Sequence, residues 1–426
     1  MFSKIEALNY RCLRYIDKEL GPFHVLVGPN ASGKTTFLDV ISFLGQLVND
    51  GLEKALYSRS PNFEDLLFRG TGTRFELAVE AQIPEHLVDQ IKDVGDYDTI
   101  RYEVAIGHEE TANESGLILL AENVYFLSHI TQAQQVFRLV FPGPPDAPDS
   151  ICRASSKRLL PKTRRIISKV RNGNDNFYSE VYKEAGKGWA PAFKLGPRKS
   201  ALANLPEDES KFPVSTWLKG LLTDGVQSIV LNSQAMRRPS PPGQPRSFRT
   251  DGSNLPWVIE DLKNRSPSAF RDWIAHLQTA LPDLESISTI ERPEDKHRYL
   301  QLRYRPGFQI PSWTASDGTL RLLALTIPAY LRELNGVFLI EEPENGIHPK
   351  AIETVFQSLS SVYDAQMLVA THSPIILAQV KPEQLLCFAK TDEGATDIVD
   401  GIHHPMLSEW QNEVSLGTLF AAGVLG

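Results

Sequence analysis

The chain has 426 residues, of which 42% are hydrophobic and 23% charged, a composition typical of a globular protein with a sizeable core. Its net charge of −8 excludes a generally basic, nucleic-acid-binding surface, so any such contact needs a local basic patch. Three widely spaced cysteines, a start without a signal-peptide core and no apolar run of membrane-helix length predict a cytoplasmic protein with reduced thiols and no membrane contact.

The first 50 residues predict a strand, a turn, a second strand, a glycine-rich loop and a helix. FHVLV (23–27) has the apolar run of a buried strand, and GPNASGKT follows it as the loop. The helix is expected from Lys34 to about Val48, because its apolar residues recur at helical spacing. One face of this helix should therefore pack against a sheet.

The loop fits the P-loop pattern, and its position between a strand and a helix is the one that phosphate binding requires. Its glycines allow backbone N–H groups to surround a phosphate, and the helix dipole adds to the attraction. Lys34 would bridge the outer phosphates and Thr35 would hold Mg²⁺. The alternative is an ordinary glycine turn before a helix. The predicted nucleotide-binding residues are Gly28, Pro29, Asn30, Ala31, Ser32, Gly33, Lys34, Thr35 and Thr36.

The middle of the chain, about 75–310, has a different character. Segments such as RFELAVEAQIP, IRYEVAIG and LILLAENVYFL alternate as antiparallel strands do, and Pro- and Gly-rich loops separate them. We expect an α/β fold with a mainly parallel core sheet, an antiparallel β subdomain and an inserted helical lobe. The predicted domains are 1–75 and 305–426 for the two halves of the nucleotide-binding domain, 76–211 for the β-rich insert and 212–304 for the helical lobe.

Two segments of the middle region suggest contacts with partners. Residues 153–174 form a basic strip that includes Arg164 and Arg165 and could contact DNA or RNA phosphates, although solvated strands and loops often have this composition. RRPSPPGQPRSFR (237–249) is either a partner-binding loop or a linker, and a linker is the favoured interpretation.

The last third of the chain carries three further motifs. SWTASDGTLRLLAL (312–325) begins a helix that is expected at 318–334. Ser316 and Asp317 are N-capping candidates, and they are followed by Gly318, a poor helix former. VFLIEEPENGIHP (337–349) ends a buried strand with two carboxylates, and VATHSP (369–374) ends the next strand with a histidine.

Beside a P-loop, these strand ends suggest catalytic roles. Glu341 would orient the magnesium shell, Glu342 would polarise the attacking water, and His372 would contact the γ-phosphate. The alternatives are an acidic strand end that faces solvent and a structural histidine.

The order of these motifs resembles that of the ABC-type ATPases, in the branch that contains RecF, SMC proteins and the OLD family. Gly28 to Thr36 match Walker A, Ser316 to Thr319 the signature motif, Ile340 to Glu342 Walker B, and His372 the switch histidine. EEPENGIHP, ATHSP and DGSNLPWVIEDL (251–262) are most similar to OLD-type and related bacterial defence ATPases. The resemblance covers about 1–75 and 305–385 well and the middle only loosely.

The resemblance implies a homodimer or higher oligomer that closes around ATP. Ser316 and the backbone amides at Gly318 would then reach the γ-phosphate of ATP held by a second subunit, which would explain the glycine. The alternative is a capped core helix in which the glycine has no role in ligand binding. Tyr10 and Arg11 lie where these ATPases place adenine or phosphate contacts. No glutamine could be assigned to the Q-loop from Gln82, Gln132, Gln134 and Gln135.

The chain also departs from the family pattern. Walker B normally begins with Asp where this chain has Glu341, the D-loop position usually held by Asp is His348, and SDGT lacks the second glycine and the glutamine of transporters. About 50 residues follow His372, too few for the Toprim nuclease domain of OLD nucleases. They contain TDEGATDIVDG (391–401), which predicts a hairpin around Gly394.

We therefore expect an ATPase that regulates a separately encoded effector, as in bacterial anti-phage modules. The alternatives are a RecF-like DNA-repair ATPase and the ATP-binding subunit of a membrane transporter. The inserted middle and the EEPE sequence argue against the transporter.

Overall fold

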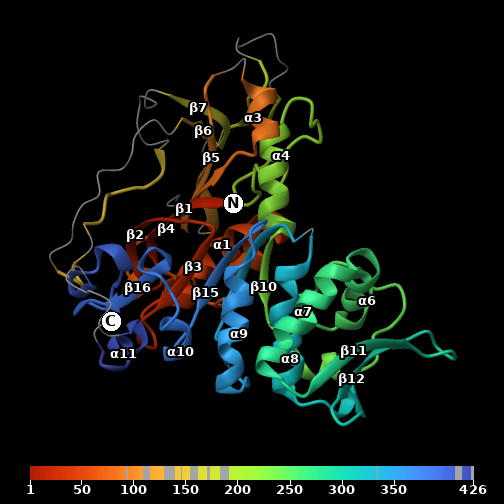
Figure 1. The fold of residues 1–426 in the computed structure, drawn as a ribbon. Coiled ribbons are helices and arrows are strands. Elements are labelled where there is room, and N and C mark those ends of the chain that lie inside the picture. The colour runs from red at the N-terminus through yellow and green to blue at the C-terminus, as the bar shows by residue number, and fades with distance from the viewer. Residues whose placement is uncertain are drawn as a thin grey trace.

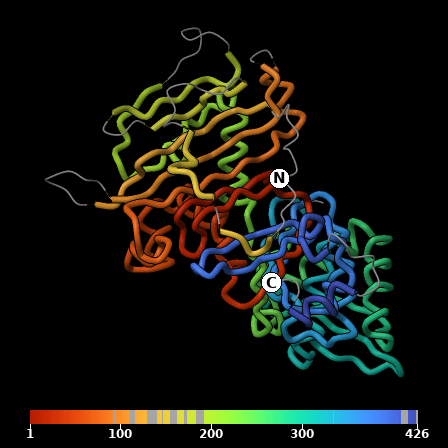
Figure 2. The backbone as a smooth tube through the Cα atoms, turned by 90° about the vertical axis from the view of Figure 1, so that its left-hand side faces the viewer, coloured from red at the N-terminus to blue at the C-terminus, as the bar shows by residue number. Residues whose placement is uncertain are grey.

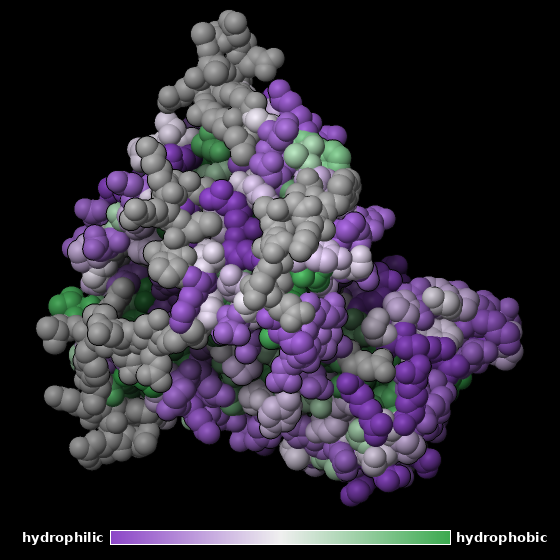
Figure 3. Space-filling view, turned by 90° about the horizontal axis from the view of Figure 1, so that it is seen from above, coloured by the Kyte–Doolittle hydropathy of each residue, from purple (hydrophilic) through white to green (hydrophobic). Residues whose placement is uncertain are grey.

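Three β-sheets and the helices around them form the described part of the protein (Figure 1). The computed structural model describes residues 1–92, 95–108, 116–128, 140–144, 146–153, 162–169, 173–182, 191–332, 334–407 and 415–423. No helix within these ranges is both long and apolar enough to cross a membrane. Seen from above, the described surface is largely hydrophilic, and its apolar side chains lie in small separate patches (Figure 3).

The six-stranded core sheet has the order β10-β14-β15-β3-β16-β17. Its first five strands are parallel, and only β17 runs antiparallel to its neighbour. This arrangement confirms the mainly parallel core predicted from the apolar strands, and the hairpin expected around Gly394 joins β16 to β17. The strands are β3 (Phe23–Val27), β10 (Val226–Ile229), β14 (Gly336–Glu341), β15 (Ala365–Ala370), β16 (Leu385–Lys390) and β17 (Thr396–Asp400).

The two faces of this sheet are buried in different hydrophobic cores. Along β14, Val337 and Leu339 join the core that contains α1 (Lys34–Asp50), whereas Phe338 and Ile340 join the core on the other face. That second core contains α8 (Asp317–Thr326) and α9 (Pro349–Ser360). Burial on both faces explains why the core strands have continuous apolar sequences.

An eight-stranded antiparallel sheet forms a second layer, and Figure 2 shows it beside the core. Its order is β2-β1-β4-β5-β6-β7-β8-β9, so the two N-terminal strands belong to it and the sheet crosses the boundary expected at residue 76. Its inner face packs on α1 through Tyr10, Phe43 and Phe75. The strands are β1 (Phe2–Tyr10), β2 (Leu13–Glu19), β4 (Arg74–Gln82), β5 (Thr99–His108), β6 (Leu117–Leu127), β7 (Thr163–Lys169), β8 (Asp175–Phe177) and β9 (Ala192–Phe193).

The expected helical lobe is present, but one of its segments belongs to the core. β10 pairs in parallel with β14, and a short π-helical turn at Leu221–Gly225 links it to α4 (Pro213–Gly220). The lobe carries a small antiparallel sheet of three strands that extends past the boundary expected at residue 304. Its elements are α5 (Ser233–Arg237), α6 (Leu255–Arg265), α7 (Pro267–Ala280), β11 (Leu284–Glu291), β12 (Arg298–Tyr304) and β13 (Phe308–Pro311).

The helix expected at 318–334 is shorter than its apolar pattern suggested. α8 spans Asp317–Thr326 and continues as a 3-10 turn at Ile327–Tyr330, where Pro328 removes a backbone donor. The other α-helices are α2 (Leu52–Tyr57), α3 (Glu85–Ile91), α9 (Pro349–Ser360), α10 (Pro374–Leu377) and α11 (Leu416–Ala421).

Candidate nucleotide site

The glycine-rich loop after β3 is shaped by close contact with the neighbouring strands. A side chain at Gly28 would meet the Phe388 carbonyl at 2.2 Å, and one at Gly33 would meet Thr396 Oγ1 at 2.2 Å. Gly33 also has a left-handed backbone with φ of 103°, which glycine adopts without strain. The two glycines are therefore needed for the fold of the loop, whatever the loop binds.

The start of α1 leaves polar groups available for a ligand. Gly33 is its N-cap and supplies no side chain to satisfy the first backbone N–H groups. Within the described structure, Ser32 Oγ is buried without a hydrogen-bond partner. Free amides at a helix N-terminus attract anions. The loop thus has the polar character of a phosphate-binding site.

Lys34 folds back over the loop that precedes it. Its Nζ donates to the carbonyl oxygens of Gly28 and Pro29 at 2.8 and 2.9 Å. Burial lowers the pKa of Lys34, while the nearby charges of Glu342 and Glu341 act in the opposite direction. The ammonium group therefore contacts the loop carbonyls, and the charges of the two carboxylates predicted at the end of β14 act on it.

Thr35 and Glu341 meet although 306 positions separate them. Thr35 Oγ1 donates to Glu341 Oε2 at 2.5 Å. The contact arises because β14 and β3 flank β15, so their carboxyl ends lie on the same edge of the sheet. The two residues predicted to hold Mg²⁺ are therefore adjacent.

Glu342 has an unusual backbone. Its φ of 49° is left-handed, a conformation that a non-glycine residue rarely adopts and that concentrates at functional sites. Its N–H donates to the Ala370 carbonyl at 2.8 Å, and its exposed side chain accepts a hydrogen bond from Asn345 Nδ2. The carboxylate is thus held by its own loop on the solvent side of the sheet edge.

His372 follows β15 and lies within the same electrostatic environment. Burial lowers its pKa first and the charge of Lys34 lowers it further, against the opposing effects of Glu342 and Glu344. The imidazole therefore loses its proton more readily than an unperturbed histidine does.

Glu344 ties the Glu342 loop to this histidine and was not identified from the sequence. Its Oε1 accepts hydrogen bonds from Thr371 Oγ1 at 2.7 Å and from the His372 N–H at 3.0 Å. The third carboxylate of EEPE was the only sequence signal for it.

The predicted signature motif begins α8, on the face of the core sheet opposite to α1. Ser316 caps the helix by accepting the Thr319 N–H at 3.1 Å. A side chain at Gly318 would lie 2.7 Å from the Gly346 carbonyl of the same chain. This internal neighbour accounts for the glycine, so the glycine alone is no longer evidence for a partner's ligand.

Tyr10 cannot contact adenine in this structure. It is fully buried against Phe43 and Phe75, and its hydroxyl donates to Asp39 Oδ2 at 2.6 Å. The aromatic–basic pair suggested a ligand contact, but the burial pattern of β1 makes the tyrosine part of the core. Its neighbour Arg11 lies 3.5 Å from the same carboxylate.

The topology supplies a Q-loop candidate that sequence reasoning missed. β10 is the edge strand beside β14, and α5 follows at the carboxyl end of β10 with Gln234 exposed. Gln82 instead ends β4 in the antiparallel sheet, and Gln132, Gln134 and Gln135 lie outside the described residues. The short sequence VQSI was the only signal for the strand.

The described part of the basic strip is engaged within the protein. Arg164 donates to the carbonyl oxygens of Ser179 at 2.7 Å and Tyr182 at 2.6 Å, and its burial lowers its pKa. The Arg165 guanidinium lies 5.7 Å from the centre of the Tyr125 ring. Residues 154–161 and 170–172 of the strip lie outside the described residues. Both arginines therefore contact groups of the protein itself, and a phosphate contact by the strip stays a prediction.

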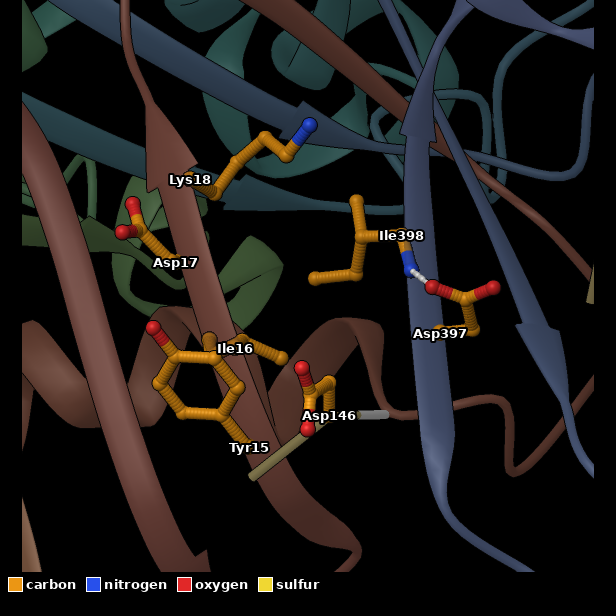
Figure 4. Close-up of a pocket in the computed structure, with 7 residues that line it drawn as sticks. All are labelled: Tyr15, Ile16, Asp17, Lys18, Asp146, Asp397 and Ile398. Atoms are coloured by element: carbon orange, nitrogen blue, oxygen red, sulfur yellow. Dashed lines mark hydrogen bonds between the residues drawn. The ribbon is translucent and has the colours of Figure 1, made fainter. Parts of the chain in front are cut away.

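A separate cavity between β2 and β17 is unsuited to a nucleotide. It has a volume of about 160 Å³ and three of its lining residues are aspartates (Figure 4). Asp397 accepts hydrogen bonds from the N–H groups of Ile398 at 2.9 Å and Gly143 at 2.8 Å. Carboxylates repel phosphates. The cavity is lined by Tyr15, Ile16, Asp17, Lys18, Asp146, Asp397 and Ile398.

Comparisons with known proteins find curated relatives that match part of this chain. The "Retron Vc95 probable ATPase" of Vibrio cholerae serotype O1 biovar El Tor is 26% identical over 160 residues, which cover 33% of this chain and 31% of that protein. An "OLD nuclease" of Thermus scotoductus (strain ATCC 700910 / SA-01) is 46% identical over 44 residues, which cover 10% of this chain and 8% of the nuclease. The chain thus matches about a third or less of the length of these curated relatives.

The solved SMC head bound to the C-winged helix domain of ScpA shares the fold, with a TM-score of 0.52, 13% identity and coverage of 93% of this chain and 97% of that chain. One family profile spans most of the protein, from residue 23 to residue 378. The chain belongs to the family described as "AAA domain, putative AbiEii toxin, Type IV TA system", and its fold is that of ABC-type ATPases of the RecF, SMC and OLD branch.

Proposed function

We propose that this protein binds and hydrolyses ATP with Mg²⁺, closes as a homodimer or higher oligomer around the nucleotide, and regulates a separately encoded effector in an anti-phage module. The contact between Thr35 Oγ1 and Glu341 Oε2 at 2.5 Å carries the proposal. It joins the glycine-rich loop to the acidic strand end at one edge of the parallel sheet. Open α/β sheets bind their ligands at such edges.

The residues present suit a magnesium–nucleotide complex. A threonine hydroxyl and a carboxylate supply hard oxygen donors, and Mg²⁺ needs only one or two of them because phosphates and water complete its shell. The described residues contain no cluster of three metal-binding side chains, which a site completed by phosphates does not require. When bound, the metal would offset charge on the phosphate oxygens.

The protein's own residues would position the reactants. Lys34 would exchange its two carbonyl partners for phosphate oxygens, because a charged acceptor forms the stronger hydrogen bond. Glu342, held by Asn345, would orient a water molecule and take its proton. His372, which follows β15 at the same sheet edge, would donate one N–H to the γ-phosphate.

Support for the effector is indirect. One similar protein is named as a retron ATPase. The segment after His372 forms β16 and β17, which complete the core sheet, so this part of the chain serves the ATPase fold. A DNA contact by the basic strip would favour the RecF-like alternative, but its described arginines contact protein carbonyls and an aromatic ring. We therefore place effector regulation first.

Two variants test the ATPase proposal. Glu342→Gln keeps the shape of the side chain but removes the base, so ATP should bind, stay uncleaved and hold subunits together in sedimentation experiments. Lys34→Ala should abolish ATP binding and this association. Hydrolysis by Glu342→Gln at the wild-type rate, or normal nucleotide affinity in Lys34→Ala, would show the assignment to be wrong.

A separate experiment tests the cellular role. Affinity purification of the tagged protein should recover the product of a neighbouring gene. DNA-stimulated hydrolysis without a stable protein partner would instead favour the RecF-like function.

A further inference from the structure

Arg237 connects the segment after β10 to the start of the signature helix. Its guanidinium donates to the Ala315 carbonyl at 3.3 Å through Nε and 3.1 Å through Nη2. Its own backbone carbonyl accepts the hydroxyl of Ser312 at 3.1 Å. Arg237 is the last residue of α5, which packs against α8. Arg237 thus contacts the segment before α8 at two residues, through its guanidinium and through its backbone carbonyl.

The same guanidinium forms an ion pair with Asp317, the first residue of α8. Arg237 Nη2 lies 2.8 Å from Asp317 Oδ1, and the two side chains are 35% and 52% exposed. A carboxylate in the first turn stabilises an isolated helix through the helix dipole. At an end that must receive a phosphate, however, the same charge repels the ligand, and the ion pair offsets that repulsion.

We propose that Arg237 is a positioning residue for the signature helix: it fixes the start of α8 and neutralises Asp317, so that the helix N-terminus accepts the γ-phosphate of ATP held by a second copy of the chain. This inference rests on the proposed ATP-bridged dimer. It adds that Asp317, the acidic second residue of the SDGT sequence, requires a positively charged partner.

The experiment measures ATP-dependent association of the Glu342→Gln protein, with Mg²⁺, by analytical ultracentrifugation. Adding Arg237→Ala should weaken association at least tenfold, while the affinity of each subunit for ATP changes less than twofold. Removal of the exposed arginine of α7 by Arg271→Ala is the matched control and should leave association unchanged. Arg237→Lys should retain part of the association, because it keeps the charge without the planar fork.

Asp317→Asn separates the charge effect from simple support of the loop. In the Arg237→Ala background it should restore most of the association, because no carboxylate then remains to repel the phosphate. Alone it should leave association intact, a result that does not depend on the folding of the arginine variants. Failure of Asp317→Asn to restore association, or full association in Arg237→Ala, would overturn the inference.

The proposed function has its own readout in this experiment. If the Glu342→Gln protein with Arg237 intact does not associate on addition of ATP, the ATP-bridged dimer is wrong and the inference falls with it. Unfolding midpoints of all variants, measured without nucleotide, identify any loss of association that comes from a damaged fold.

Discussion

The backbones of Gly318 and Gly346 pack directly against each other, with the position of a Gly318 Cβ only 2.7 Å from the Gly346 carbonyl oxygen. This contact joins the first turn of α8 to the loop that carries Glu342 and Asn345. The start of the signature helix and the loop of the proposed catalytic carboxylate are therefore in direct contact within one subunit.

Replacing Gly318 with alanine should destabilise the protein by about 1–3 kcal/mol, because the new methyl group overpacks against a backbone carbonyl. Gly220→Ala is the matched control, since this helical glycine of α4 has a right-handed backbone and open space around its Cβ position. That control should be neutral or stabilising by up to about 1 kcal/mol. Urea unfolding of both variants provides the measurement, and equal midpoints would contradict the packing argument.

Thr35→Val should remove the effect of Mg²⁺ on nucleotide affinity. The change deletes the hydroxyl that contacts Glu341 but keeps a β-branched side chain at the start of α1. Calorimetric titration with ATP, with Mg²⁺ and with EDTA, should show similar affinities in the variant and a clear difference in the wild type. Thr35→Ser keeps the hydroxyl and should behave as the wild type. A full Mg²⁺ effect in Thr35→Val would remove this residue from the metal site.

Arg164→Gln should affect stability and leave any DNA binding unchanged. The arginine donates to two carbonyl groups, and leaving them without their donor should cost about 1–3 kcal/mol. The affinity for a DNA duplex, measured from 50 to 200 mM salt, should keep the wild-type slope. A shallower slope would restore the basic strip as a phosphate contact.

Glu180 should make the stability of the protein depend on pH. It is fully buried, and desolvation raises its pKa from 4.5 to about 7 even though the N–H groups of Val214 and Ser215 donate to it. The folded state then binds more protons than the unfolded state between these values. The stability that this difference in proton binding contributes is fully present below pH 4.5 and is lost as the pH rises to about 7. The free energy of unfolding then falls by an amount on the order of 3 kcal/mol.

Glu180→Gln tests this linkage, because glutamine does not titrate. The free energy of unfolding of both proteins is measured from pH 5 to pH 8. The wild type should become less stable relative to the variant as the pH rises. A difference that stays constant over this range would show that Glu180 keeps an ordinary pKa.

Local sequence patterns were sufficient wherever neighbours along the chain define the structure. The strand at 23–27, the glycine-rich loop, the helix from Lys34 and the hairpin around Gly394 are all present as predicted. Strand and helix periodicity, together with the glycine positions, carry this information within a few residues. The parallel core followed from the same patterns, because only strands buried on both faces are apolar throughout.

Tertiary structure decided the contacts between residues far apart in the chain. The pairing of β10 with β14, the burial of Tyr10, the internal partners of Arg164 and the approach of Gly318 to Gly346 all depend on strand order and on how the layers pack. A tyrosine beside an arginine looks the same in sequence whether it faces a ligand or a core. Sequence alone determined which chemical groups this protein has at its strand ends, and only the packing of its sheets decided which of those groups meet, because such contacts depend on positions hundreds of residues apart.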